Sequence, residues 1–145
     1  MNDFAIRNRE SLGLVSLDIP LISNLDVWIN IALIRMYHRN QPRAEAEKEV
    51  IGYLDRYGLG KIAYRRNSDL TDRERFCVML LRAAMVADAA LLIDRPFRMM
   101  PEMEDGRFII DRIGRIEDLY RTSCIFDYAW FEDRYGNSDA AEHTI

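Results

Sequence analysis

Leu70-Thr-Asp-Arg-Glu-Arg-Phe-Cys-Val-Met-Leu-Leu-Arg-Ala-Ala84, followed closely by Ala89-Ala-Leu-Leu-Ile-Asp-Arg-Pro-Phe97, is the stretch that decides the fold. In the first segment, Thr71 and Glu74 have the spacing of a capping box, and apolar residues then recur at helical intervals to about Ala87. The second segment is a short aliphatic run that ends on Asp94, which favours a buried strand. The two together predict a helix that leads into a strand, a unit typical of a parallel sheet.

The rest of the chain continues this alternation. Strands are predicted at residues 12–17, 89–93 and 123–126, and helices at 24–37, 43–57, 71–87, 108–120 and 128–135, with 1–11 a short helix or arm. Asn24 is the expected N-cap of the first long helix, and Gly58 is a natural stop for the second. We therefore expect a helix-rich α/β fold with a three-stranded parallel sheet and an inserted three-helix subdomain.

The length indicates one domain. A chain of 145 residues fits a single domain at 1–136, with 24–87 as its helical subdomain and 137–145 as a flexible tail. The net charge of −4 disfavours a nucleic-acid partner, because phosphate backbones select basic surfaces. Cys77 and Cys124 form no CxxC motif, which favours buried thiols in a reducing compartment. With no signal-like or membrane-spanning run, we expect a cytoplasmic protein without direct membrane insertion.

The order of the segments resembles an ABC-transporter ATPase domain over residues 12–136. Residues 13–33 look like the Q-loop strand, the loop after it and the first helix of the helical subdomain, with Asn30 where that helix usually carries an asparagine. Residues 70–84 are similar to the signature sequence and its arginine-rich helix. Residues 90–97 are similar to the Walker B strand, with Asp94 at the magnesium-shell aspartate. The resemblance implies a partial P-loop NTPase fold of the ABC ATPase type.

Several positions of these motifs differ from the family pattern. Leu17 stands at the Q-loop glutamine, and Arg95 stands at the catalytic glutamate. Asp72 and Arg73 replace the two signature glycines, Thr71 replaces the signature serine, and Glu74 replaces the glutamine. The switch histidine falls at Asp127 or Tyr128.

These substitutions remove nucleotide chemistry. A guanidinium at position 95 cannot orient a nucleophilic water, and a carboxylate at position 72 repels phosphate from the helix N-terminus. The capping box of Thr71 and Glu74 satisfies the N–H groups that phosphate would otherwise bind. Asp94 alone is a weak magnesium candidate. We therefore expect no catalytic residues, no cofactor and no resident metal, hence a protein that is not an enzyme.

The sequence contains no G-x-x-x-x-G-K-[ST] motif. The resemblance begins just before the Q-loop strand, so the P-loop strand, its helix and the preceding β-subdomain are expected to be missing. In the family, the strand at residues 123–126 would pair with the P-loop strand. We expect another chain or the N-terminal arm to cover this exposed edge, which favours a homo- or hetero-oligomer.

Three functions remain open. The first is a non-catalytic regulatory or structural partner of an ABC permease or ATPase subunit, held at the inner membrane through the transporter. Its candidate partner-binding residues are Ile19, Leu21, Ile22 and Trp28. The second is a nucleotide-binding subunit that is completed in trans by the P-loop of another chain. The third is a free-standing structural module.

Overall fold

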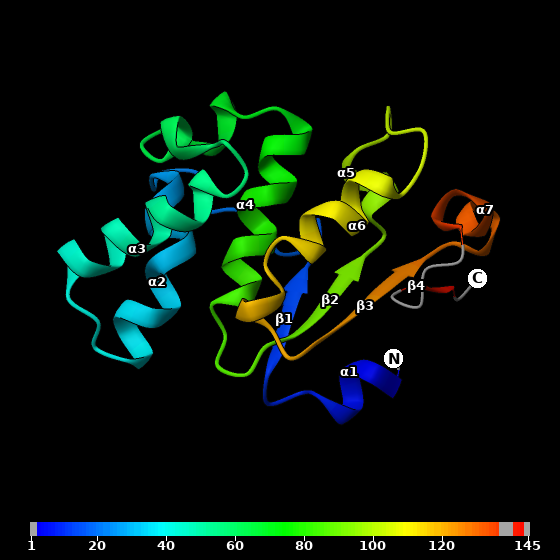
Figure 1. The fold of residues 1–145 in the computed structure, drawn as a ribbon, viewed down its shortest axis with the longest axis horizontal. Coiled ribbons are helices and arrows are strands. Elements are labelled where there is room, and N and C mark those ends of the chain that lie inside the picture. Colours follow the sequence, from blue (N-terminus) through cyan, green and yellow to red (C-terminus); the bar gives the residue numbers. More distant parts are fainter. Residues whose placement is uncertain (1–2, 137–140, 144–145) are drawn as a thin grey trace.

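A computed structural model describes residues 3–136 and 141–143. In this part of the chain, β1 (Leu12–Val15), β2 (Ala90–Asp94), β3 (Thr122–Asp127) and β4 (Ala141–His143) form a single sheet. The strand order is β1-β2-β3-β4, and every neighbouring pair is parallel. The three predicted strands are confirmed, and β4 is added to them at the edge of β3 (Figure 1).

The helices lie beside and across this sheet. Their bounds are α1 (Asp3–Arg7), α2 (Val27–His38), α3 (Arg43–Asp55), α4 (Asp72–Ala84), α5 (Pro96–Met99), α6 (Arg107–Gly114) and α7 (Glu132–Tyr135). Figure 1 shows α2, α3 and α4 as a helical unit on the β1 side of the sheet. The predicted α/β class and the three-helix insert between the first two strands are therefore confirmed.

Some predicted boundaries were wrong. Helix α2 begins at Val27 with Asp26 as its N-cap, and the carbonyl of Asn24 instead accepts a hydrogen bond from Arg66. Helix α6 ends at Gly114, because the chain tightens into a 3₁₀ turn at Glu117–Leu119 and leaves Tyr120 extended. Helix α5 forms between β2 and α6, where no helix was predicted, and Pro96 occupies its first turn, which tolerates a proline.

Helix α4 is the centre of the main core. It buries a run of side chains that includes Phe76, Leu80 and Ala84. Its close packing on β1 depends on Gly13, since a Cβ atom at that position would lie 2.3 Å from the carbonyl oxygen of Ala83. The capping box is present as predicted: Thr71 Oγ1 accepts from the Glu74 N–H at 3.1 Å, and Glu74 Oε1 accepts from the Thr71 N–H at 2.9 Å.

The N-terminal helix and the C-terminal strand cover different parts of the sheet. Phe4 and Ala5 of α1 pack on a second apolar cluster with Ala90, Leu92 and Cys124. The outer edge of β3 is paired by β4, which lies within the segment predicted to be a tail; 137–140 and 144–145 lie outside the described residues. Ala141–His143 pairs with residues 125–127, so the chain's own C-terminal strand, and not the N-terminal arm, covers this part of the edge; an oligomer stays a prediction.

Cys77 and Cys124 are both buried, in agreement with the sequence prediction. Among the helices of the described residues, none has the length and apolar character needed to cross a bilayer.

Candidate functional site

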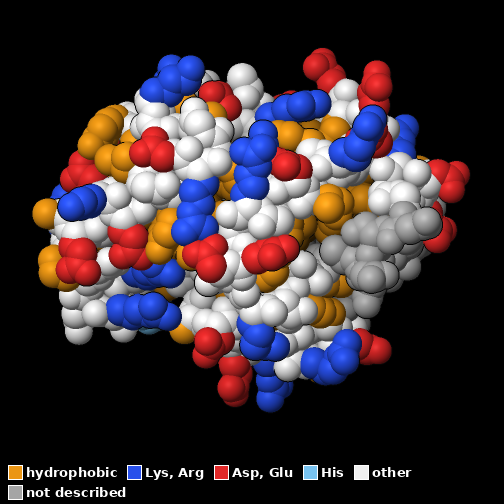
Figure 2. All heavy atoms as spheres, in the orientation of Figure 1, with side chains coloured by type: hydrophobic (Ala, Val, Ile, Leu, Met, Phe, Trp, Pro, Cys, Tyr) orange, Lys and Arg blue, Asp and Glu red, His pale blue; other side chains and the backbone are white. Residues whose placement is uncertain are grey.

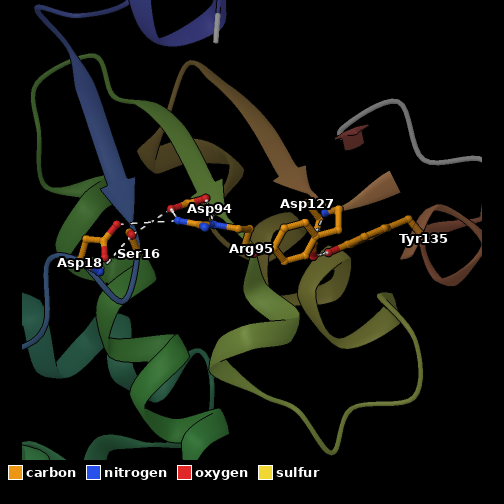
Figure 3. A network of polar contacts seen from close by, with 7 residues as sticks. Ser16, Asp18, Asp94, Arg95, Asp127 and Tyr135 are labelled. Carbon is orange, nitrogen blue, oxygen red and sulfur yellow. Dashed lines mark hydrogen bonds and ion pairs between the residues drawn. The ribbon is translucent and has the colours of Figure 1, made fainter. Parts of the chain in front are cut away.

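The positions that resemble Walker B lie at the carboxyl ends of the parallel strands. Ser16 directly follows β1, Asp94 ends β2, and Asp127 ends β3. Figure 3 shows their side chains in a row across this end of the sheet. In open parallel α/β sheets this end is where ligands usually bind. Its chemistry therefore depends on which of these groups are still free.

Both carboxylate oxygens of Asp94 already have partners. Arg95 donates Nε to Oδ1 at 2.8 Å and Nη2 to Oδ2 at 3.1 Å. Ser16 donates Oγ to Oδ2 at 3.0 Å. A metal ion at Asp94 would have to displace a bidentate guanidinium, which is among the strongest partners of a carboxylate.

The first residues of the loop after β1 close this network into a ring. The Asp18 N–H donates to Ser16 Oγ at 3.1 Å, and the Asp18 carboxylate lies 3.7 Å from Arg95 Nη2. Figure 3 shows Asp18 and Ser16 facing Arg95 across the ends of β1 and β2. The hydrogen bond to Asp94, and then that to Tyr128, raises the pKa of Arg95. Arg95 therefore remains a cation that neutralises its surroundings.

The backbone of Arg95 is unusual. Its φ of 48° and ψ of 60° place it in the left-handed region, which is costly for a residue with a Cβ atom. Its N–H donates to the carbonyl of Phe126 at 2.6 Å, which ties the end of β2 to β3. The neighbouring strand and Pro96 at the start of α5 hold the chain in this conformation.

Asp127 belongs to a separate buried pair. Its Oδ2 accepts from the hydroxyl of Tyr135, and its Oδ1 accepts from the Tyr128 N–H at 2.8 Å. Burial, followed by this hydrogen bond to Asp127, raises the pKa of Tyr135. Asp127 is 1% exposed, so this residue fastens α7 to the end of β3 and does not face a ligand.

The residues at the signature positions contact other side chains of this chain. Asp72 pairs with Arg75 at 3.1 Å, and the Arg73 guanidinium lies over the ring of Phe108, 4.8 Å from its centroid. Thr71 and Glu74 cap each other. At the N-terminus of α4, the N–H groups of Thr71 and Glu74 are therefore already bonded to the chain's own side chains.

The four candidate partner-binding residues divide into two groups. Ile19 and Ile22 are 46% and 42% exposed, and the neighbouring Leu17 is also exposed. Leu21 and Trp28 are buried in the core, so both are removed from the set of surface candidates. Leu21 and Trp28 are apolar like the two exposed residues, and the sequence alone does not show which apolar side chains point into the core.

Ile19 and Ile22 border a groove of about 290 Å³ between β1, α2 and the end of α4. Its apolar walls include Ile19, Ile22, Leu33, Ile34 and Val86. Sequence reasoning did not single out Leu33, Ile34 and Val86 for this surface. Leu33 and Ile34 lie on α2, whereas Val86 follows the end of α4, so no single sequence signal connects the three.

Two polar side chains hold the loop that carries Ile19 and Ile22. Arg82 donates Nη1 to the Pro20 carbonyl at 2.9 Å and Nη2 to the Ile19 carbonyl. The Asn30 side chain accepts from the Ile22 N–H at 2.8 Å and donates to the Ile22 carbonyl at 3.1 Å. Burial lowers the pKa of Arg82. The groove is therefore pre-formed.

Comparison with curated proteins places this chain beside ATP-binding proteins of import systems. A methionine import ATP-binding protein, MetN, of Rhodopseudomonas palustris is 32% identical over 118 residues, covering 80% of this chain and 31% of the relative. A molybdate/tungstate import ATP-binding protein, WtpC, of Archaeoglobus fulgidus is 32% identical over 131 residues, covering 86% of this chain and 53% of the relative. A phosphonates import ATP-binding protein, PhnC, of Nocardia farcinica is 26% identical over 125 residues, covering 80% of this chain and 46% of the relative. No family model matches the chain.

This chain is related to ABC transporter ATP-binding proteins. It spans about a third to a half of the length of these curated relatives. Its α/β architecture is accordingly a partial ABC-ATPase-like fold.

Proposed function

We propose that this chain is a non-catalytic, ABC-ATPase-like protein that binds a component of an ABC transporter, either a permease or an ATPase subunit, as a regulatory or structural partner. The observation that carries the proposal is the groove beside Ile19 and Ile22. An exposed apolar groove on a rigid frame is the surface against which an amphipathic helix of another protein docks. The relationship to ATP-binding import proteins supports a transporter component as that partner.

The non-catalytic part of the proposal is supported by the residues at the carboxyl ends of the strands. Asp94 is engaged on both oxygens, and Arg95 stands where the resemblance implies the catalytic glutamate. A permanently charged guanidinium does not accept a proton from water. At the N-terminus of α4, a phosphate would meet the carboxylate of Asp72, which pairs with Arg75.

The docking function is tested by capture from native membranes. The tagged wild-type chain should recover a transporter component that mass spectrometry identifies. Changing both Ile19→Asp and Ile22→Asp should abolish this recovery, because a charge at each site opposes burial. Ile6→Asp is the matched control: Ile6 is 52% exposed on α1, away from the groove. Recovery of no transporter component, or equal recovery by the double variant, would contradict the proposal.

A thermal-shift assay tests the absence of nucleotide chemistry. Mg-ATP should leave the melting temperature of the purified chain unchanged, because a ligand stabilises a protein only by binding its folded state. A nucleotide-binding subunit completed in trans instead predicts stabilisation that appears when a P-loop-containing partner is added. Stabilisation of the chain alone by Mg-ATP would refute the non-catalytic assignment.

A further inference from the structure

A second pocket, of about 210 Å³, lies at the other end of α4 from the groove. It is an open pocket, lined by Tyr57 and Leu59 after α3, by Arg73, Glu74 and Cys77 of α4, and by Phe108 and Arg112 of α6. Over the region where α4 and α6 lie side by side in Figure 1, Figure 2 shows hydrophobic side chains flanked by Lys and Arg. This pocket shares no lining residue with the groove.

The pocket has an excess of positive charge. Arg73 has no carboxylate partner within ion-pair distance in the described part of the chain. Arg112 and Arg115 share the single carboxylate of Asp111. Glu74 is the one acidic side chain in the lining, and its Oε1 already accepts the Thr71 N–H.

The two arginines of the lining are held by aromatic rings. The ring of Phe108 lies 4.8 Å from the guanidinium carbon of Arg73 and 4.6 Å from that of Arg112. The ring of Tyr57 lies 5.5 Å from the latter. Stacking uses the face of a guanidinium and leaves its N–H edge available to an acceptor. Arg73 is therefore positioned with its donors available, whereas Arg112 already donates Nη1 to Asp111 and keeps its remaining N–H groups.

One of these donors is buried without an acceptor. Arg112 Nε has no hydrogen-bond partner among the described residues. Buried donors are almost always paired in folded proteins, and a bound ligand or a water is a way to satisfy this one.

We propose that this pocket binds a small carboxylate with a flat apolar part, whose oxygens pair with Arg73 and Arg112 and whose apolar part contacts Phe108 and Tyr57. The fork of a guanidinium matches the geometry of a carboxylate. The volume is smaller than that of a site for a drug-sized molecule and suits a benzoate-sized one. Burial raises the pKa of Cys77 to about 12, so its thiol stays neutral and does not repel the anion.

Titration with benzoate, followed by two-dimensional NMR, tests this site. We expect saturable shifts confined to residues 57, 73–77 and 108–112. Benzamide, which has nearly the same shape without the charge, should bind with an affinity at least about tenfold lower. Arg73→Gln should weaken benzoate binding by a similar factor. Arg73 is exposed, so the variant should remain folded.

Arg98→Gln is the matched control, because Arg98 is an exposed arginine outside this pocket. It should leave benzoate affinity unchanged. Absence of saturable shifts, equal binding of benzamide, or an unaltered affinity in Arg73→Gln would each overturn the proposal. These outcomes are independent of capture through the groove, since the groove does not include residues 73, 108 or 112.

Discussion

The guanidinium of Arg95 holds the carboxylate of Asp94 through two hydrogen bonds, Nε to Oδ1 at 2.8 Å and Nη2 to Oδ2 at 3.1 Å. Adjacent residues in an extended strand point to opposite faces, so they do not usually pair in this way. Here the left-handed backbone at Arg95 turns its side chain back toward Asp94. The carboxylate at the Walker B-like position is thereby neutralised by its own neighbour.

The strain at Arg95 can be separated from its ion pair. Arg95→Ala and Arg95→Gly both remove the guanidinium, but only glycine adopts φ near 48° without cost. We expect the glycine variant to have a free energy of unfolding about 1 kcal/mol higher than the alanine variant, measured by urea denaturation. An alanine variant as stable as the glycine variant would show that the backbone is not left-handed in solution.

Substituting alanine for Gly13 and for Gly52 should change the free energy of unfolding in opposite directions. At Gly13 the new Cβ would meet the backbone carbonyl of Ala83 at 2.3 Å, and we expect a loss of about 2 kcal/mol or more. At Gly52, within α3, nothing lies within 4 Å, and we expect a gain of about 0.5–1 kcal/mol from helix propensity. Urea denaturation of both variants measures the difference. Equal effects would contradict the close packing of α4 on β1.

The capping box gives a prediction about α4. Thr71→Ala should lower the free energy of unfolding by about 1 kcal/mol, because the Glu74 N–H loses its acceptor. Thr71→Ser keeps a hydroxyl at the same place and should retain most of the stability. Chemical denaturation followed by circular dichroism gives both values. If Ser and Ala were equally destabilising, the hydroxyl would not be the cause.

Glu49 should make the free energy of unfolding depend on pH in the acidic range. Burial would raise its pKa, but hydrogen bonds from Tyr53 and Gln41 and the charge of Arg35 outweigh it, so the pKa lies below the ordinary value of 4.5. A carboxyl whose pKa is lower in the folded state stabilises the fold at every pH above its pKa in the unfolded state. That stabilisation is lost as the pH falls through its pKa in the folded state. The free-energy difference between wild type and Glu49→Gln should therefore be greatest at neutral pH and shrink below about pH 4.5. A difference that is constant from neutral to acidic pH would exclude this linkage.

The elements were predictable where their signals are local. The capping box of α4 and the aliphatic run of β2 need only a few neighbouring residues, and both were placed to within three residues. The start of α2 was misplaced because Asn24 and Asp26 are both acceptable N-caps, and contacts with Arg66 decide between them. Strand β4 was not predicted, because three residues near a chain end become a strand only when β3 offers its edge.

The sequence by itself determined the α/β class, the order of the first three strands, the helical insert and the identity of the residues at the ABC-like motif positions. The elements follow from hydrophobic periodicity and local capping, which act over a few residues, whereas the motif positions come from the resemblance to ABC-transporter ATPases. The tertiary structure alone decided that Ser16, Asp18, Asp94 and Arg95 close into one ring, since Ser16 and Asp94 lie 78 positions apart. It also decided that Ile19 and Ile22 face outward while Leu21 and Trp28 face inward. The physical reason is that the direction of a loop side chain depends on which distant groups, here Arg82 and Asn30, bind the loop backbone.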